Sequence, residues 1–319
     1  MIKVPQVVTI GETMVMFSPE SNGPLRYVHN FQKRMAGAES NVAIGLCRLG
    51  HSCGWISKVG EDEFGHYLIR EIRGEGVDTS EVKVDPVAPT GIMFKEIQEG
   101  RETRVYYYRK GSAAGFMNPE DLNESYIRDA KILHITGITP ALSESCLKML
   151  ERAVTIAKQN KVMVSLDPNI RLKLWSKGKA AEVLKELFSH VDILLPGLDE
   201  AEMLLGTQDP HEIIDTFLNY GIKIIALKMG ALGTWVADRN ERIKVDIFPV
   251  KNIIDPIGAG DAFAAGFLSG ILEGKQLSQC GKIANAMGAF AITTVGDIEG
   301  LPGRVELDAF INNVEKVSR

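Results

Sequence analysis

Predicted strands and helices alternate along most of this chain, and the alternation limits what it can fold into more than any other feature. Apolar runs that predict strands lie at residues 7–10, 55–59, 132–136, 162–166, 191–195, 222–227, 234–237 and 243–248. Segments with apolar residues at helical spacing lie at 36–50, 64–75, 143–160, 177–189, 199–205, 210–220, 262–272, 277–294 and 306–317. Strands joined through helices pair in parallel, and the helices then cover both faces of the sheet. We therefore predict an α/β fold with a mainly parallel central sheet.

One segment interrupts this alternation. Residues 92–98 and 103–108 are both extended in composition and are joined by a short polar turn around Gly100, which predicts a β-hairpin. We expect this hairpin to form a flap outside the main sheet. Alternate residues of a strand share a face, so Tyr107 and Arg109 point the same way. A hydroxyl beside a planar guanidinium suits a carboxylate or phosphate, although an aromatic-rich strand also serves packing alone.

Composition and charge exclude several classes of protein. The 319 residues are 45% hydrophobic and 24% charged, as in soluble globular proteins, and the formal net charge of −5 gives no reason to expect nucleic acid or an anionic membrane as partner. There is no signal-peptide pattern and no apolar run of membrane-spanning length, so we expect a cytoplasmic protein. None of the four cysteines forms a C-x-x-C pair, which argues against a zinc site. No Walker A pattern occurs, so a P-loop ATPase is disfavoured.

The segment 255–263 predicts a site that binds an anion and carries out a reaction on it. Gly258, Ala259 and Gly260 precede Asp261, and a helix follows from residue 262 to about 272. The first amides of a helix lack intrahelical partners and carry partial positive charge, so they bind phosphate or a developing oxyanion. A carboxylate there repels phosphate, which makes sense if Asp261 accepts a proton from an attacking hydroxyl. The alternative is a glycine-rich turn capped by an aspartate.

Polar or glycine-rich segments follow several predicted strands. They are 167–171, 197–200, 228–233 and 255–261. Ligands of parallel α/β sheets bind beyond the carboxyl ends of the strands. The shared position of these segments therefore predicts one composite site at that edge of the sheet.

A second motif opens the helix predicted at 36–50. Asn41 lies near the start of this helix and is either a cap or an amide that reaches outward. The segments 36–50 and 255–263, in this order, resemble the two signatures of the ribokinase-like carbohydrate kinases, also called the PfkB family. The resemblance covers essentially the whole chain. It implies a single domain over 1–319, an α/β body with a small β-sheet lid at approximately 12–34 and 91–112, ATP as donor, and Mg²⁺.

The resemblance also implies roles for individual residues. Asp261 matches the catalytic base, and Gly258, Ala259 and Gly260 match the anion hole. The implied nucleotide-binding residues are Asn169, Lys228, Gly230, Gly233, Gly258, Gly260 and Asn285, the last beside the adenine. Glu200 matches a glutamate that organises Mg²⁺-bound water, but Gly197 stands where the family has asparagine.

Within the family, the segments 11–17, 106–113 and 167–171 look most like the 2-keto-3-deoxygluconate kinase group. This likeness implies a sugar-acid site made by Gly37, Asn41, Tyr107, Arg109, Arg171 and Asp261. Two guanidinium groups suit a carboxylate, and a neutral sugar would leave them unpaired.

We therefore expect ATP-dependent phosphorylation of the terminal hydroxyl of 2-keto-3-deoxygluconate. The alternatives are a fructokinase or other neutral-sugar kinase, and a non-catalytic sugar-acid binding protein on the same fold. The edge of the predicted hairpin favours a homo-oligomer, a dimer or larger. The sequence leaves open the stereochemistry of the sugar acid and any dependence on monovalent cations.

Overall fold

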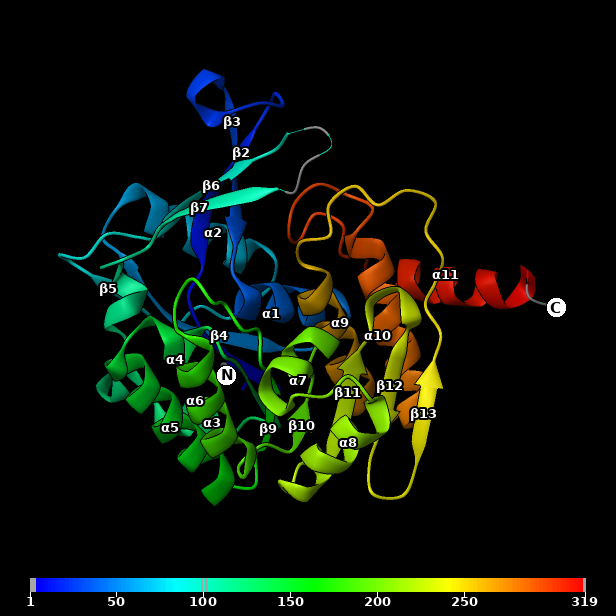
Figure 1. The fold of residues 1–319 in the computed structure, drawn as a ribbon. Helices are drawn as coiled ribbons and strands as arrows, with labels where there is room; N and C mark the ends of the chain where they lie inside the picture. Colours follow the sequence, from blue (N-terminus) through cyan, green and yellow to red (C-terminus); the bar gives the residue numbers. More distant parts are fainter. Residues whose placement is uncertain (1–3, 99, 101–102, 318–319) are drawn as a thin grey trace.

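The computed structural model describes residues 4–98, 100 and 103–317. Within these residues, nine strands form one sheet in the order β13-β12-β11-β10-β9-β8-β1-β4-β5 (Figure 1). All pairs from β5 to β11 are parallel, and β12 and β13 add antiparallel at one edge. The strands are β1 Val7–Ile10, β4 Cys53–Gly60, β5 Val82–Asp85, β8 Ile132–Thr136, β9 Met163–Asp167, β10 Ile193–Leu194, β11 Ile224–Lys228, β12 Thr234–Ala237 and β13 Arg242–Val245.

Helices cover both faces of this sheet because its strands are apolar on both sides. In β1, Val7 packs into one core cluster and the next residue, Val8, packs into the other. The first face carries α1 Ala38–Arg48, α2 Glu63–Gly74, α9 Ala259–Leu272, α10 Leu277–Ala291 and α11 Arg304–Val317. The second carries α3 Glu124–Arg128, α4 Thr139–Leu142, α5 Glu144–Gln159, α6 Lys177–Phe188, α7 Leu198–Leu205 and α8 Pro210–Asn219. The predicted α/β architecture is confirmed.

Four further strands form a separate small sheet that stands away from the main body (Figure 1). They are β2 Met14–Pro19, β3 Phe31–Ala36, β6 Ile92–Glu96 and β7 Arg104–Tyr108, in the order β3-β2-β6-β7. The strands β6 and β7 are antiparallel neighbours, which confirms the hairpin and its place outside the main sheet. Its predicted turn, 99–102, lies outside the described residues apart from Gly100.

Aromatic side chains gather on one face of the small sheet. Phe17 and Phe94 stack with their ring centroids 5.0 Å apart, and Phe31 and Tyr108 meet Phe94 edge-on. Methionines from β2 and β6 are buried on the other face. This packing gives the small sheet its own apolar support.

The structure corrects three local predictions. Helix α9 begins at Ala259, three residues before the predicted start, because the carbonyl of Gly258 accepts the first helical hydrogen bond from Ala262. Asp261 therefore lies inside the first turn and is not the cap. Strand β13 ends at Val245, so an irregular segment, and not a strand, leads directly into the 255–261 motif.

The remaining expectations concern membranes and cysteines. In the described part of the chain, no helix is both long and apolar enough to cross a bilayer. The four cysteines are all free thiols, and three of them are buried.

Candidate active site

Three of the predicted segments meet at the carboxyl ends of the parallel strands. Lys228, the last residue of β11, places its Nζ 2.6 Å from Oδ2 of Asp167, the last residue of β9. Glu200, in the first turn of α7, accepts hydrogen bonds of 2.8 Å from the main-chain N–H groups of Ile170 and Gly197. The predicted composite site at this edge of the sheet is therefore assembled.

Neighbouring charges shift the pKa values of Lys228 and Glu200. Burial disfavours the ammonium form of Lys228, but the neighbouring carboxylates of Asp167, Glu200 and Asp261 together raise its pKa above the usual value. Burial, followed by the charge of Asp167, raises the pKa of Glu200. Lys228 therefore stays positively charged beside two carboxylates.

The N-terminus of α9 lies next to this group. Gly258 is the N-cap residue with φ of +83°, a conformation that favours glycine, and a Cβ there would lie 2.7 Å from the main-chain oxygen of Asp297. A Cβ on Gly260 would lie 3.7 Å from Nζ of Lys228. The unpaired amides of the helix start and the ammonium group of Lys228 thus face the same region, an arrangement that suits an anion.

Asp261 extends from the first turn of α9 towards α1. Its Oδ2 accepts a 2.8 Å hydrogen bond from Nδ2 of Asn41, a residue of α1 that is 220 positions away in the sequence. Burial, together with the charges of Asp167 and Asp297, raises the pKa of Asp261 to about 8, although Asn41 and Arg171 act in the opposite direction. A carboxyl group poised near neutral pH suits a general base.

The start of α1 positions Asn41, the partner of Asp261 in this hydrogen bond. Gly37 is the N-cap of α1, and a Cβ there would lie 2.5 Å from Oγ1 of Thr13, so only glycine allows the close approach of the two segments. The capping alternative for Asn41 is wrong, since its amide is directed to Asp261 and, at 3.4 Å, to Asp297.

The predicted sugar-acid residues lie on elements that contact each other. The guanidinium carbon of Arg109 is 5.7 Å from the ring centroid of Tyr107. Lys173, two residues after Arg171, donates a 3.0 Å hydrogen bond to the carbonyl of Val105 and lies 5.3 Å from the same tyrosine ring. The loop after β9 and the strand β7 are therefore neighbours.

Besides Lys228, Gly258 and Gly260, the predicted nucleotide-binding residues are two glycines and two asparagines. Gly233 has φ of +90°, and a Cβ there would lie 2.4 Å from the main-chain oxygen of Val245, whereas Gly230 has φ of +53° and open space around it. Asn169 adopts φ of +38°, which is uncommon for a residue with a side chain. Asn285 is fully engaged within the protein, because it accepts from Thr234 at 2.7 Å and donates to main-chain oxygens of residues 245 and 246.

The residues of the site are suited to a metal ion that arrives bound to the phosphates of a nucleotide, and not to a metal held by protein side chains alone. No group of three or more metal-binding side chains occurs in the described part of the chain. Both oxygens of Glu200 are occupied by main-chain N–H groups, and Asp167 is paired with Lys228. Mg²⁺ commonly keeps several waters and binds through substrate phosphates, so Glu200 and Asp167 would hold the ion through its bound waters.

Sequence reasoning missed Glu12, Lys95 and Asp297. Glu12 lies two residues after the end of β1, at the carboxyl edge of the sheet, and that position was the available signal. Lys95 lies in a strand and Asp297 in a long loop, and no local pattern distinguishes them from solvated charges.

The fold and the site together are those of a carbohydrate kinase, an enzyme that transfers a phosphoryl group to a sugar. Residues 4–304 match the pfkB family of carbohydrate kinases, and the chain belongs to that family. It is 37% identical over 308 residues to the 2-dehydro-3-deoxygluconokinase of Bacillus subtilis, covering 96% of this chain and 95% of that one.

Two further comparisons agree. The chain is 37% identical to the 2-dehydro-3-deoxygluconokinase of Thermoproteus tenax, with coverage of 96% and 94%. The solved structure of an E. coli protein described as a candidate ribokinase II, in complex with ATP and Mg²⁺, superposes with a TM-score of 0.90 at 30% identity, covering 97% of this chain and 99% of that one. These comparisons confirm the predicted family and fold, and they support ATP as the donor.

Proposed function

We propose that this kinase transfers the γ-phosphoryl group of ATP to the terminal hydroxyl of 2-keto-3-deoxygluconate and forms its 6-phosphate. The two 37% identical relatives bear the name of this activity. At that identity the name alone does not assign the substrate of this chain, so the argument depends on the residues of the site.

The proposed reaction uses the groups at the start of α9. Asp261 accepts the proton of the sugar hydroxyl as its oxygen attacks the γ-phosphorus, and the bond to the bridging oxygen of ADP breaks. The amides of Gly258–Gly260 and the ammonium of Lys228 stabilise the charge on the transferring group. Mg²⁺, arriving with ATP, would neutralise phosphate charge, and Glu200 would hydrogen-bond a metal-bound water.

A single observation favours an acid over a neutral sugar: the buried guanidinium of Arg109, a predicted sugar-acid residue, keeps one donor that the described protein leaves unpaired. Arg171 is exposed and lies close enough for its charge to lower the pKa of Asp261. Arg109 is nine-tenths buried, and its Nε has no hydrogen-bond partner among the described residues. A substrate carboxylate could pair with both guanidinium groups, whereas a neutral sugar would offer the buried Nε of Arg109 only an uncharged acceptor.

A substrate panel tests the proposal. ADP release should be measured with ATP, Mg²⁺ and each of 2-keto-3-deoxygluconate, 2-keto-3-deoxygalactonate, fructose and ribose. We expect kcat/KM for a 2-keto-3-deoxy sugar acid to exceed that for fructose by at least about 10²-fold, because the site depends on a charged group that fructose lacks.

Each other outcome has a defined meaning. Preference for fructose would contradict the sugar-acid proposal and leave a neutral-sugar kinase. Tight binding of the acid in calorimetry without any ADP release would instead support the non-catalytic binding protein.

We also infer that the protein forms a dimer or larger homo-oligomer through the small sheet. Strand β7 is at the edge of that sheet in the described structure, and Tyr106 and Tyr108 on it are 41% and 65% exposed. Exposed edges of this kind pair readily with another strand. Light scattering should give a multiple of the 35.0 kDa chain mass, and a monomer at micromolar concentration would contradict the inference.

A further inference from the structure

The small sheet inserts a buried positive charge into the main body. Lys95, in β6, has a side chain only 1% exposed, and its Nζ lies 3.0 Å from Oδ2 of Asp255 and 3.5 Å from Oδ1 of Asp297. Burying a charge is costly unless it is paired. The ammonium group and the two carboxylates therefore form one unit, which we call the Lys95 cluster: Lys95, Asp255 and Asp297.

Both carboxylates of the Lys95 cluster belong to loops that shape the start of α9. Asp255 accepts hydrogen bonds from the main-chain N–H groups of Ile257, at 3.2 Å, and Gly296, at 3.3 Å. The main chain of Asp297 packs so closely on Gly258 that a Cβ there would overlap it. The cluster thus holds the segment before the anion-binding amides against the 295–299 loop.

The side chain of Asn41 connects the Lys95 cluster to Asp261, the proposed base. Nδ2 of Asn41 donates to Asp261 at 2.8 Å and to Asp297 at 3.4 Å. Burial raises the pKa of Asp297 and the charge of Lys95 lowers it. Lys95 therefore favours the charged form of the carboxylate that shares Asn41 with the base.

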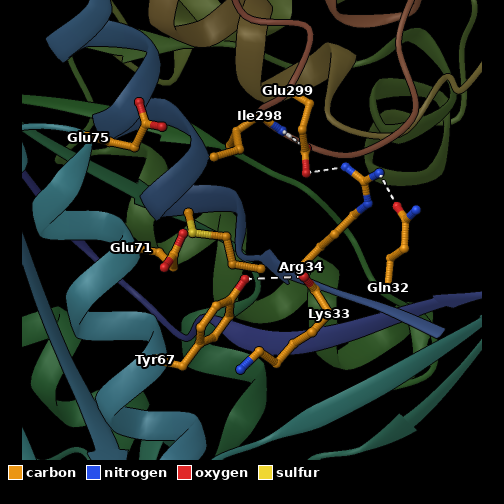
Figure 2. Close-up of a pocket in the computed structure, with 9 residues that line it drawn as sticks. Gln32, Lys33, Arg34, Tyr67, Glu71, Glu75, Ile298 and Glu299 are labelled. Carbon is orange, nitrogen blue, oxygen red and sulfur yellow. Dashed lines mark hydrogen bonds and ion pairs between the residues drawn. The ribbon is translucent and has the colours of Figure 1, made fainter.

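A second strand of the small sheet contacts the same loop from outside. Figure 2 shows Arg34 of β3 extending to Glu299, with which it forms an ion pair, while Gln32 accepts a 2.8 Å hydrogen bond from the other end of its guanidinium. Arg34 also donates to the carbonyl of Val295 at 3.3 Å. Both Lys95 and Arg34 thus bind the small sheet to the 295–299 loop, and Lys95 also contacts Asp255 in the segment that leads into α9.

We propose that Lys95 is a positioning residue that couples the small sheet to the phosphoryl-transfer site, an inference that rests on the transfer step proposed above. Lys95 is covered by protein, so we assign it no direct contact with sugar or nucleotide. It acts by keeping two carboxylates together, so that the Gly258–Gly260 amides and the Asn41–Asp261 contact stay in place. In this proposal, the position of the small sheet over the sugar also sets the position of Lys95 between Asp255 and Asp297.

The main test is Lys95→Met, which preserves much of the side-chain length and removes the charge. We expect kcat to fall by about 10²-fold, because small displacements of reacting groups are costly, while KM for sugar and for ATP changes by less than about threefold. The same loss should occur with every sugar that is turned over. Lys33→Met, on the exposed edge strand of the same sheet, is the matched control and should leave kcat unchanged.

A second substitution distinguishes positioning from ligand contact. In Lys95→Met, the two carboxylates face each other without a cation, so adding Asp297→Asn should restore at least about tenfold of the lost kcat. If Lys95 instead contacted the substrate, the first change would raise KM for the sugar and the second would restore nothing. Either result, or an unchanged kcat in Lys95→Met, would overturn the proposal.

A measurement without turnover keeps this test independent of the substrate assignment. In the ligand-free protein, hydrogen exchange at amides 257–261 should be faster in Lys95→Met than in wild type and unchanged in Lys33→Met. Equal hydrogen-exchange rates at these amides in wild type and both variants would contradict the positioning role of Lys95, even if no sugar in the panel were phosphorylated. A failed substrate panel with faster exchange would contradict only the proposed function.

Discussion

Arg109 and Glu12 form a buried ion pair that joins the residue after β7 to the segment between β1 and β2. The side chain of Glu12 is 1% exposed and that of Arg109 is 10% exposed, and the hydroxyl of Ser112 donates a 2.7 Å hydrogen bond to the other oxygen of Glu12. One end of the guanidinium is thus fixed by the protein. The buried Nε, which has no partner in the described chain, is consistent with a second anionic group binding there.

We predict that Arg109→Ala raises KM for the sugar acid by about 30-fold or more, while KM for ATP hardly moves. The reason is the loss of one partner of a desolvated, charged hydrogen bond. Arg109→Lys should recover only part of the affinity, because a point charge cannot make the two-pronged contact. Initial rates with the acid and with a neutral-sugar analogue measure this, and the analogue should be insensitive to the change.

Arg109→Ala also leaves the carboxylate of Glu12 buried and unpaired, which should lower the free energy of unfolding by about 3 kcal/mol. Adding Glu12→Gln removes that charge and should restore most of the stability without restoring KM. If the double variant recovers both quantities, Arg109 serves the packing of the small sheet and does not recognise the acid.

Asp261→Asn should lower kcat by about 10²–10⁴-fold with little loss of ATP binding, since the amide cannot accept the hydroxyl proton. The N-cap of α9 is Gly258, so the helix keeps its start in this variant. Single-turnover rates and calorimetric titration with ATP measure the two effects. Near-normal kcat would refute the assignment of the base.

The raised pKa of Asp261 predicts a pH dependence of stability. With a pKa of about 8 in the folded protein and the ordinary value of 3.8 in the unfolded chain, the folded state holds an extra proton between these values. The free energy of unfolding therefore falls as pH rises through this window. Asp261→Asn cannot titrate, so urea unfolding should show its stability relative to wild type growing from pH 5 to pH 8.5. A difference that is independent of pH would contradict the pKa.

The raised pKa of Asp261 also predicts how kcat/KM falls at low pH. The base must be deprotonated in the free enzyme, so kcat/KM should rise with pH and level off above about pH 8. A profile that is flat from pH 6 to pH 9 would show that Asp261 is already ionised in the free enzyme.

Gly258→Ala should lower kcat by about 10²-fold, because the new Cβ would meet the main chain of Asp297 and displace the anion-binding amides. Gly274→Ala is the matched control: it also has positive φ, +66°, but nothing lies within 4 Å of the new Cβ. The control should lose about 1 kcal/mol of stability from backbone strain alone and keep its kcat. Equal kcat in both variants would show that the close approach at Gly258 has no part in catalysis.

Local patterns in the sequence are enough to predict the architecture and the part of the site that lies at the ends of the strands. Apolar runs buried on both faces, with helical periodicity between them, leave few alternatives to a parallel sheet covered by helices, and strands such as 132–136 were predicted with their observed bounds. Glycines and charged groups after strands identified Lys228, Glu200 and Asp167 as neighbours. These signals are local, and parallel strands bring their carboxyl ends to one edge whatever lies between them.

The pairing of the buried charges, in contrast, depends on how distant segments pack. Asn41 contacts Asp261 across 220 residues, Lys95 contacts Asp255 across 160, and Arg109 is paired with Glu12 from the distant segment between β1 and β2. A charged residue in a strand looks the same in sequence whether it is solvated or buried against a carboxylate. The difference arises when distant segments pack, because burial removes water and each charge must then be matched by another part of the protein.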